Sequence, residues 1–410
     1  MTDETWYSSL RGSSWLSKIR GIKAILASGF LVLLGMMLLT VAYQVDIISS
    51  NTVPKDGTSK DASLTQQNDE RNPSPESKSK TRIFDMILLN DELDTLDLRL
   101  HELHAVVDVF FIMEAEHTFS GNPKPLYFRD NETRFRQFRS KIVHITIPHI
   151  SPEEEAQFKE DGMWTNENFS RNKGFRVATD TMKPNDGDWI ILSDLDEIPK
   201  RSFLETVRAP DPNTSTGRRL LEGFPESDGD VFTLGCRFYY YSYEYRHRGD
   251  WNGPMLFRYR DSDSPIFSRP ESNPYPHLNM VQDIMANGWL RAGERLRNKR
   301  DEGAPGFDDQ CYHCSWCFSN ITQVTRKMQS YSHTDHNQEK YSSRKWILDH
   351  FSQGIDLFDR GGQDYDYIED NQDVPQYVRD NKSKFSFMLR RKGLPNAGFL
   401  DVDPLNPLAK

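Results

Sequence analysis

Three carboxylates stand close together in this sequence, directly after a short apolar segment. Residues 189–192 are apolar, and Asp194, Asp196 and Glu197 follow within the next five positions. Negative charges at this spacing repel one another unless a cation or a polar ligand lies among them. Hard divalent cations such as Mg²⁺ and Mn²⁺ prefer oxygen ligands and often bridge a carboxylate to the phosphates of a substrate. The spacing therefore suits metal-assisted chemistry on a phosphate-bearing substrate, and it also suits a solvated acidic loop or a helix N-terminus.

The four cysteines and one histidine form a second group with metal-binding chemistry. Cys311, Cys314 and Cys317 surround His313, and Cys236 lies further upstream. This spacing is compatible with a zinc site. In an oxidising compartment the same cysteines form disulfides instead, with a pairing that the sequence leaves open. The choice therefore depends on where the protein resides.

The N-terminal region predicts a single membrane anchor. Residues 24–45 form an uncharged stretch of 22 residues rich in Leu, Val, Ile, Met and Gly. At about 1.5 Å per residue, this stretch spans a hydrocarbon core of ~30 Å. Four basic residues precede it, and Asp46 is the first charge after it. The positive-inside rule therefore places residues 1–23 in the cytosol and the rest of the chain across the membrane, as in a type II protein.

The remaining chain divides into a stem, a large domain and a short tail. Residues 46–81 contain no aromatic residue and are dominated by polar types, so we expect a disordered stem. We expect a lumenal catalytic domain at residues 82–395 and a tail at residues 396–410. This organisation indicates a resident of the secretory pathway, and we expect a Golgi membrane protein whose cysteines are disulfide-bonded. Five glycosylation sequons are compatible with a lumenal domain, at Asn131, Asn168, Asn213, Asn320 and Asn381.

The charge balance excludes one class of partner. The chain has a formal net charge of −10 at pH 7, and its first 23 residues are net basic, so the acidic excess lies beyond the membrane anchor. A domain with this charge is not built for nonspecific binding to nucleic acid. We therefore expect no nucleic-acid partner.

Alternating patterns predict an α/β fold. Residues 83–89, 106–113, 142–147, 189–192 and 231–234 are apolar runs typical of buried strands. Helical spacing of apolar residues follows the first of these runs up to His104, and it recurs at residues 164–182. This alternation predicts a mainly parallel sheet flanked by helices on both faces. Ligands of such sheets bind beyond the carboxyl ends of the strands, where the three carboxylates fall.

Six segments of the large domain form a recognisable set. They are FDMILLNDELDTLDLRLHEL (84–103), VVDVFFIMEAEHTFSGNPKPLYF (106–128), ENFSRN (167–172), LSDLDEIP (192–199), HCSWCF (313–318) and GIDLFDRGG (354–362). Together, over roughly residues 82–394, they resemble family 17 of the glycosyltransferases. The resemblance implies an inverting, metal-dependent transferase that uses UDP-N-acetylglucosamine and has a GT-A-like nucleotide-diphosphosugar transferase fold. It also implies that the acceptor is a β-linked mannose of a glycoprotein N-glycan core.

By similarity, Asp196 contacts the metal ion, Mn²⁺ or Mg²⁺, and Asp194 contacts the nucleotide or a metal-bound water. Glu197 either orients these ligands or lies at a helix start ahead of Pro199. His313 is a candidate third metal ligand, with a structural imidazole as the alternative. A metal ion at this point would act as a Lewis acid on the leaving diphosphate.

Glu114 and Arg171 are further candidates for donor binding. Glu114 precedes a loop that could contact the uridine or the diphosphate, and its alternative role is that of a structural capping carboxylate. Arg171 could neutralise a phosphate or pair with an acid on its own helix. Inversion also needs a general base for the acceptor hydroxyl. The candidates for that base, among which the sequence does not choose, are Asp283, Glu294, Asp308 and Asp309.

Alternatives of other classes remain open for the domain. The aromatic run at residues 238–245 suits sugar stacking, although such runs more often fill a sheet. A phosphatase of the haloacid-dehalogenase type also places Asp-x-Asp after an apolar strand, but its motif normally lies near the start of the domain. A non-catalytic, membrane-anchored glycan-binding protein would need neither nucleotide nor metal. Binding of a UDP-sugar with and without Mn²⁺ separates these functions.

Overall fold

The computed structural model describes residues 81–157, 159–222, 231–259, 306–361 and 365–408. All of them belong to one compact unit, Lys78–Lys410. The predicted cytosolic tail and membrane anchor lie outside the described residues, as does the predicted stem except for its last residue. Within the described ranges, no helix combines the length and the apolar composition that crossing a membrane requires.

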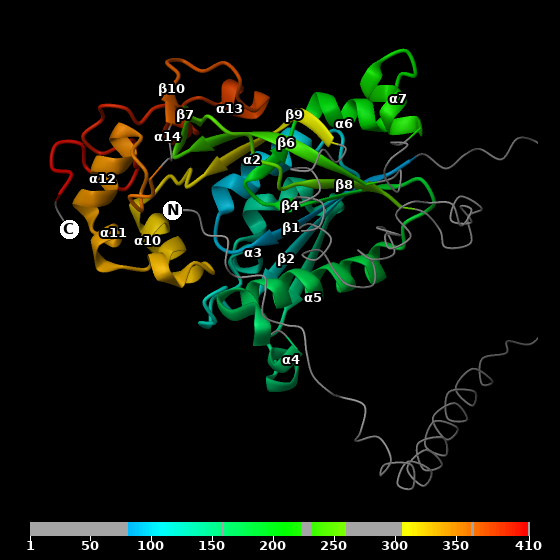
Figure 1. The fold of residues 1–410 in the computed structure, drawn as a ribbon, viewed down its shortest axis with the longest axis horizontal. Helices are drawn as coiled ribbons and strands as arrows, with labels where there is room; N and C mark the ends of the chain where they lie inside the picture. The colour runs from blue at the N-terminus through cyan, green and yellow to red at the C-terminus, as the bar shows by residue number, and fades with distance from the viewer. Residues whose placement is uncertain (1–80, 158, 223–230, 260–305, 362–364, 409–410) are drawn as a thin grey trace, which may run out of the picture. The chain divides into compact units, whose positions relative to one another are not determined.

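A mixed sheet of ten strands forms the centre of the unit (Figure 1). Its main path has the order β10-β7-β6-β8-β4-β1-β2-β3, and β9 pairs with both β5 and β6. The strands are β1 (Ile83–Leu89), β2 (Val109–Ala115), β3 (Ile142–Ile147), β4 (Trp189–Asp194), β5 (Glu197–Pro199), β6 (Val231–Tyr240), β7 (Ser242–His247), β8 (Met255–Arg258), β9 (Gly306–Ser315) and β10 (Tyr365–Tyr367).

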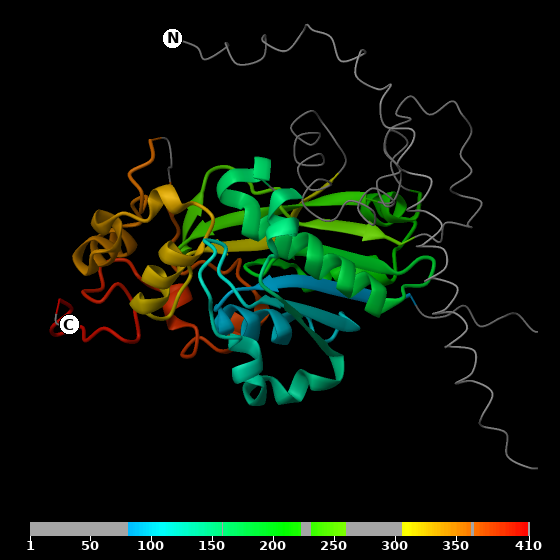
Figure 2. The same ribbon diagram turned by 90° about the horizontal axis from the view of Figure 1, so that it is seen from below.

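Helices lie on both sides of this sheet, which confirms the predicted α/β class (Figures 1 and 2). The α-helices are α2 (Leu93–Leu103), α3 (Tyr127–Asp130), α4 (Pro152–Gln157), α5 (Thr165–Met182), α6 (Arg201–Arg208), α7 (Ser215–Glu222), α10 (Ile321–Ser330), α11 (Glu339–Ser342), α12 (Arg344–Gln353), α13 (Gln376–Asp380) and α14 (Ser386–Leu389). Three 3₁₀ helices accompany them, η1 (Glu132–Lys141), η2 (Lys159–Trp164) and η3 (Thr334–His336).

The parallel half of the sheet follows the predicted alternation. β4, β1, β2 and β3 are adjacent and parallel. β1 and β3 have the predicted bounds, whereas β2 begins three residues later than predicted because residues 106–108 belong to the turn after α2. The carboxyl ends of these strands share one edge of the sheet, so β4 delivers Asp194 to the edge at which ligands of α/β sheets bind.

The two faces of the parallel half bury separate cores. In β1, Phe84 and Met86 point to one face and pack with Phe175 of α5, because side chains alternate along a strand. Ile83 and Ile87 point to the other face, where α2 and α6 pack. α5 approaches the sheet closely, since a Cβ atom on Gly174 would stand 2.7 Å from Sδ of Met113. These contacts fix α5, and with it Arg171, against the strands that lead to the acidic loop.

The prediction of a mainly parallel sheet is wrong, because the other half of the sheet is mixed. β6 and β9 are parallel, but β8 is antiparallel to β4 and β6, and β7 is antiparallel to β6 and β10. The reversal between β6 and β7 takes place at Tyr241, whose φ of 69° is in the left-handed region. No Gly or Pro marks this turn, so residues 238–245 read as one aromatic run. Tyr239, Tyr243 and Tyr245 of this run are buried, which favours the sheet-filling role over sugar stacking.

All four cysteines are paired, which confirms disulfides rather than a zinc site. Cys236 of β6 is bonded to Cys311 of β9, and Cys314 is bonded to Cys317. The first bond joins strands that are neighbours in the sheet. The second follows His313 directly along the chain. β9 is therefore cross-linked on both sides of this histidine.

One of the five sequons is inaccessible in the folded chain. Asn168 lies in α5 and is only 5% exposed, with its amide oxygen buried. A glycan on this side chain would have to displace the packing of α5 against the sheet. Asn131 and Asn213 are exposed.

Candidate active site

The acidic loop lies at the carboxyl end of β4 and lines a pocket. Asp194 ends β4, and Asp196 lies in the turn before β5. The wall of the pocket comes from the end of β1, from α5, β9 and α10, and from the segment after α10. Its charged and polar lining residues include Glu92, Glu167, Arg171, Asp194, Asp196, His313, Lys327, Ser332 and His333.

A buried arginine in α2 holds the backbone of the acidic loop. Arg99 is fully buried, and its guanidinium forms hydrogen bonds of 2.8 and 2.7 Å with the two carboxylate oxygens of Asp85. Nη1 also donates to the carbonyl oxygens of Asp194 and Glu197, both at 2.8 Å. Nη2 donates to Oγ of Ser193 at 2.6 Å. These hydrogen bonds hold the backbone of the loop in place, and the side chains of its two aspartates line the pocket.

Asp194 is already paired with a cation of the protein. Its Oδ1 lies 2.5 Å from Nη1 of Arg171, whose Nη2 lies 2.6 Å from Oε1 of Glu167. Burial alone would lower the pKa of Arg171, but the charges of Asp194 and Glu167 raise it above its usual range. This arrangement combines both predicted roles of Arg171, because the arginine pairs with an acid on its own helix and also faces the pocket.

Asp196 lies between two further cations. Its Oδ2 is 3.7 Å from Nε2 of His313 and 3.7 Å from Nζ of Lys327. Burial would raise the pKa of Asp196, but Lys327 and His313 hold it well below its usual range. The same charges act in reverse on His313, whose pKa is raised by Asp196 against the effect of burial. Asp196 is therefore a pocket-lining carboxylate whose two nearest cationic groups lie beyond ordinary hydrogen-bond distance.

Lys327 brings a partly buried positive charge to the pocket from α10. Its Nζ lies 3.8 Å from Oε1 of Glu92, and the rings of Trp316 and Phe318 flank it at 5.5 and 5.4 Å. Burial would lower the pKa of Lys327, but Asp196 and Glu92 raise it. The lysine is therefore charged at neutral pH.

Glu197 shapes the loop and does not line the pocket. It is 2% exposed, and one carboxylate oxygen accepts the backbone N–H of Asp194 at 2.8 Å. The other accepts the indole N–H of Trp251. Burial and the charge of Asp194 raise the pKa of Glu197. These contacts correspond to the orienting role considered for Glu197, whereas the next helix, α6, begins only at Arg201.

The residues present fit a metal ion in part. Asp196 and His313 offer an oxygen and a nitrogen 3.7 Å apart, a separation that two ligands of one ion can have. The carboxylate of Asp194 is engaged by Arg171. In the part of the chain that the structure describes, Asp194, Asp196 and His313 do not form a ready three-ligand group. An ion at Asp196 would therefore take most of its ligands from the substrate or from water, as Mg²⁺ commonly does.

Glu114 forms structural contacts and is not among the residues that line the pocket. It is fully buried, accepts the backbone N–H of Phe128 at 2.9 Å, and lies 3.0 Å from Nε2 of His144. Nζ of Lys124 lies 3.8 Å from the same carboxylate. These partners use both oxygens of Glu114, and they favour the structural capping role over nucleotide binding.

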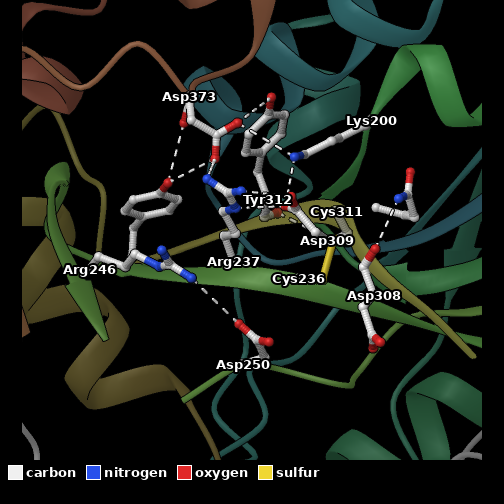
Figure 3. Close-up of polar contacts among 12 residues, drawn as sticks. Lys200, Cys236, Arg237, Arg246, Asp250, Asp308, Asp309, Cys311, Tyr312 and Asp373 are labelled. Atoms are coloured by element: carbon white, nitrogen blue, oxygen red, sulfur yellow. Dashed lines mark hydrogen bonds and ion pairs between the residues drawn. A yellow bond between two sulfur atoms is a disulfide. The ribbon is translucent and has the colours of Figure 1, made fainter. Parts of the chain in front are cut away.

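Two of the four base candidates, Asp308 and Asp309, are described, and neither lines the pocket. Asp283 and Glu294 lie outside the described residues. Figure 3 shows Asp309 between Lys200 and Arg237, with contacts of 2.7 Å to each. Burial would raise the pKa of Asp309, but these two cations lower it, so it is a weak base. Asp308 neighbours this cluster on an exposed part of β9 and is not among the pocket residues.

Sequence reasoning missed several residues of the pocket. Lys327 and Ser332 lie far along the chain from the acidic loop and belong to no recognisable motif. Glu92 follows β1 closely. Its position after the carboxyl end of a strand was the sequence signal that could have identified it as a pocket residue. In the sequence, Arg99 resembles an ordinary surface residue of a helix. Its hydrogen bond to Asp85, which joins α2 to β1, appears only in the structure.

Comparisons with known proteins agree in the family that they indicate. A family model described as glycosyltransferase family 17 matches residues 72–288 and 297–393. A rat protein named beta-1,4-mannosyl-glycoprotein 4-beta-N-acetylglucosaminyltransferase is 28% identical over 247 residues, which cover 58% of this chain and 40% of that protein. The human protein of the same name is 28% identical over 247 residues, covering 58% of this chain and 41% of its own length. This chain thus aligns with about two fifths of the length of these relatives.

A solved structure of 4-diphosphocytidyl-2C-methyl-D-erythritol synthase shows only a weak likeness. It aligns with a TM-score of 0.29 and 11% identity, covering 57% of this chain and 90% of its own. A likeness at this level carries no conclusion about fold or function.

Proposed function

Because this chain belongs to glycosyltransferase family 17, we propose that it transfers N-acetylglucosamine from UDP-N-acetylglucosamine to a mannose of a glycoprotein N-glycan, in β-1,4 linkage. The name of the rat and human relatives supports this acceptor and this linkage. The observation that carries the proposal is the pocket at the end of β4, where Asp194 and Asp196 meet Arg171 and Lys327. The four charges suit a sugar nucleotide, which carries its own charge on the diphosphate.

The charge balance of the pocket supports a requirement for a divalent cation. Its described lining residues include four carboxylates, against two permanent cations, Arg171 and Lys327, and two ionisable histidines, His313 and His333. With both histidines neutral, a diphosphate entering this pocket alone would meet an excess of negative charge. An ion held by Asp196 and His313, Mn²⁺ or Mg²⁺, would offset that excess and would supply a Lewis acid for the leaving diphosphate. The four carboxylates are Glu92, Glu167, Asp194 and Asp196.

Two cations of the protein, Arg171 and Lys327, and a general base would carry out the other parts of the reaction. Arg171 is positioned to bind a phosphate oxygen, because Asp194 and Glu167 hold its guanidinium at the wall of the pocket. Lys327 supplies a second fixed charge on the opposite side of Asp196. Preorganised charges of this kind stabilise the negative charge that develops on UDP during transfer. Transfer by direct displacement also needs a base for the mannose hydroxyl, and Asp283 and Glu294 stay candidates for it.

The fold and location are part of the same proposal. The parallel strands β4-β1-β2-β3, with the acidic loop at their carboxyl ends, support a GT-A-like fold. The N-terminal sequence supports a type II Golgi membrane protein with its anchor at residues 24–45, a stem at residues 46–81 and a lumenal domain at residues 82–395. In intact microsomes, a C-terminal tag should then resist added protease until detergent is present. Digestion of the tag without detergent would contradict this topology.

A direct assay tests the proposed reaction. Purified protein is given UDP-N-acetylglucosamine, a mannose-terminated N-glycan and Mn²⁺, and both UDP release and the glycan mass are followed. We expect the glycan to gain one N-acetylhexosamine, and chelation of the metal by EDTA to stop the gain. Release of inorganic phosphate from phosphomonoesters would indicate a phosphatase, and glycan binding without any turnover would indicate a lectin-like protein. Either of these results would overturn the proposal.

A further inference from the structure

A second group of metal-binding side chains lies beside the pocket, outside the acidic loop. Asp335 and His336 lie in the short helix η3, and His333 directly precedes it. One potential ligand atom from each of the three lies within 4.8 Å of the other two. No other such trio occurs in the described part of the chain. We propose that these three residues bind a transition-metal ion such as Zn²⁺, at a site separate from Asp194 and Asp196.

The distances within the trio suit a single ion. Oδ1 of Asp335 lies 3.8 Å from Nδ1 of His333, and Oδ2 lies 3.5 Å from Nε2 of His336. A tetrahedral zinc ion with ligands at roughly 2.0–2.2 Å keeps neighbouring ligand atoms about 3.3–3.5 Å apart. The two imidazole rings lie side by side, with centroids 5.2 Å apart and an angle of 20° between their planes. The ligand atoms of the trio are therefore close to the spacing that a single ion requires.

The two histidines are held by neighbours that are not themselves ligands. Nδ1 of His336 lies 3.0 Å from the hydroxyl oxygen of Tyr331, and its ring stacks on Phe358 with centroids 4.3 Å apart. When Nδ1–H donates to Tyr331, Nε2 is left to bind the ion, as in zinc sites where a second residue fixes the histidine tautomer. The ring of His333 packs edge-on against Trp164, at 4.8 Å between centroids.

The local charges are compatible with a cation. Neutral imidazole is the form of histidine that binds a metal ion. Arg360 is the cation that acts on His336, but its Nη2 lies 2.6 Å from Oδ1 of Asp356, which offsets its charge. Two imidazoles and one carboxylate are a ligand set that favours Zn²⁺ or Co²⁺ over Mg²⁺ or Ca²⁺. Three protein ligands also leave one position of a four-coordinate ion open.

A metal ion at the trio would brace one wall of the pocket. Tyr331, Ser332 and His333 all line the pocket. The hydroxyl of Ser332 donates to Oε2 of Glu167, and the other oxygen of Glu167 binds Arg171. Fixing His333 therefore restrains the segment that supports this arginine. The proposed site is structural, and its occupancy does not depend on the reaction proposed above.

Cobalt binding by the full-length protein tests the site directly. The protein is purified without a histidine tag, treated with EDTA, transferred to metal-free buffer and titrated with Co²⁺, which has visible ligand-field absorption when bound by nitrogen and oxygen. We expect saturation at one ion per chain and displacement of the cobalt by Zn²⁺. Asp335→Asn and His333→Asn should each weaken cobalt binding by at least about tenfold, since each removes one of three ligands. Asp335 is 56% exposed in its side chain, so its variant should fold, and a thermal melt checks this.

Two matched variants locate the ion. His149→Asn removes an exposed histidine outside the trio and should leave the cobalt spectrum unchanged. Asp196→Asn should also keep the spectrum, because its carboxylate does not belong to the trio. Absence of cobalt bands in the unmodified protein at millimolar Co²⁺ would overturn the proposal. So would bands that survive Asp335→Asn and His333→Asn but disappear with Asp196→Asn, because the ion would then lie at the acidic loop.

Discussion

The guanidinium of Arg171 lies 2.5 Å from a carboxylate oxygen of Asp194, the first acid of the Asp-x-Asp sequence. Asp196, the second acid, lies 3.7 Å from Nε2 of His313 and 3.7 Å from Nζ of Lys327. The two aspartates of this short pattern therefore have different surroundings. Asp194 forms a direct ion pair, whereas the nearest cationic groups of Asp196 lie beyond ordinary hydrogen-bond distance.

The first prediction concerns Asp196. Asp196→Asn keeps the shape of the side chain and removes its charge, so we expect turnover to fall by about a hundredfold or more, as for other preorganised electrostatic groups. The measurement is UDP release with Mn²⁺ and a mannose-terminated acceptor. Asp349→Asn is the control, because Asp349 lies on the surface of α12 beside Lys345 and far from the pocket lining. Near-normal turnover by a folded Asp196→Asn protein would remove Asp196 from the proposed site.

The second prediction concerns the geometry of Arg171. Arg171→Lys keeps the charge, but a lysine cannot contact Asp194, Glu167 and a phosphate at the same time with a planar fork. One charge-assisted hydrogen bond contributes roughly 1.5–3 kcal/mol, so we expect kcat/KM for UDP-N-acetylglucosamine to fall by about ten- to a hundredfold. Arg176→Lys makes the same change at an exposed position of the same helix and should have no such effect. Equal kinetics for the two variants would exclude a donor-binding role for Arg171.

The third prediction separates a structural from a catalytic role for Asp309. Lys200 and Arg237 lower the pKa of this carboxyl in the folded protein. A carboxyl with a lowered folded pKa stabilises the fold above its unfolded pKa of about 3.9, and this stabilisation is lost as the pH falls. Asp309→Asn should therefore reduce the urea midpoint at pH 7, and the difference from wild type should shrink towards pH 3.

Turnover supplies the decisive control for Asp309. Because its carboxylate lies outside the pocket lining, we expect Asp309→Asn to keep near-normal turnover at a temperature where it is folded. The side chain is 42% exposed, so added salt should reduce the stability difference. Loss of turnover with unchanged stability would restore Asp309 as a candidate base.

The fourth prediction compares the two disulfides. Cys236–Cys311 closes a loop of 75 residues in sequence separation, and Cys314–Cys317 closes one of 3. In the chain-entropy account, losing the long loop costs about 4 kcal/mol of unfolding free energy and losing the short one about 2 kcal/mol. Urea unfolding of the two double Cys→Ala variants measures the difference. A larger loss from the short loop would show that native contacts near His313, rather than loop length, dominate.

The parallel strands could be predicted because their signal is local. Residues 83–89 and 142–147 are apolar runs with polar residues on either side, and they correspond to the strands β1 and β3. In the antiparallel half only residues 231–234, the start of β6, were predicted as a strand. Its turn at Tyr241 lacks the Gly or Asn that usually marks a left-handed position, and the chain around it is aromatic throughout.

The pocket could be predicted only as far as its residues lie near one another in the sequence. Asp194 and Asp196 stand two positions apart, so their shared role is visible in one short pattern. Lys327 reaches Asp196 because α10 packs beside the end of β9, a tertiary contact that no local pattern encodes. Arg99 was missed because its burial depends on its ion pair with Asp85 and on its hydrogen bonds to backbone carbonyl groups, which only the fold brings together.

The order in which the pocket's residues occur along the chain has a consequence for biosynthesis. Leu88 is contributed near the start of the folded unit and His333 near its end, and Lys327 and Tyr331 also come late. Translation produces these segments one after another. Asp194 is made after its partner Arg171, whereas Asp196 lacks His313 and Lys327 until β9 and α10 have been made. No fragment that stops short of His333 has the complete pocket. Premature termination before this point should therefore give a protein without transferase activity, even if the parallel strands fold.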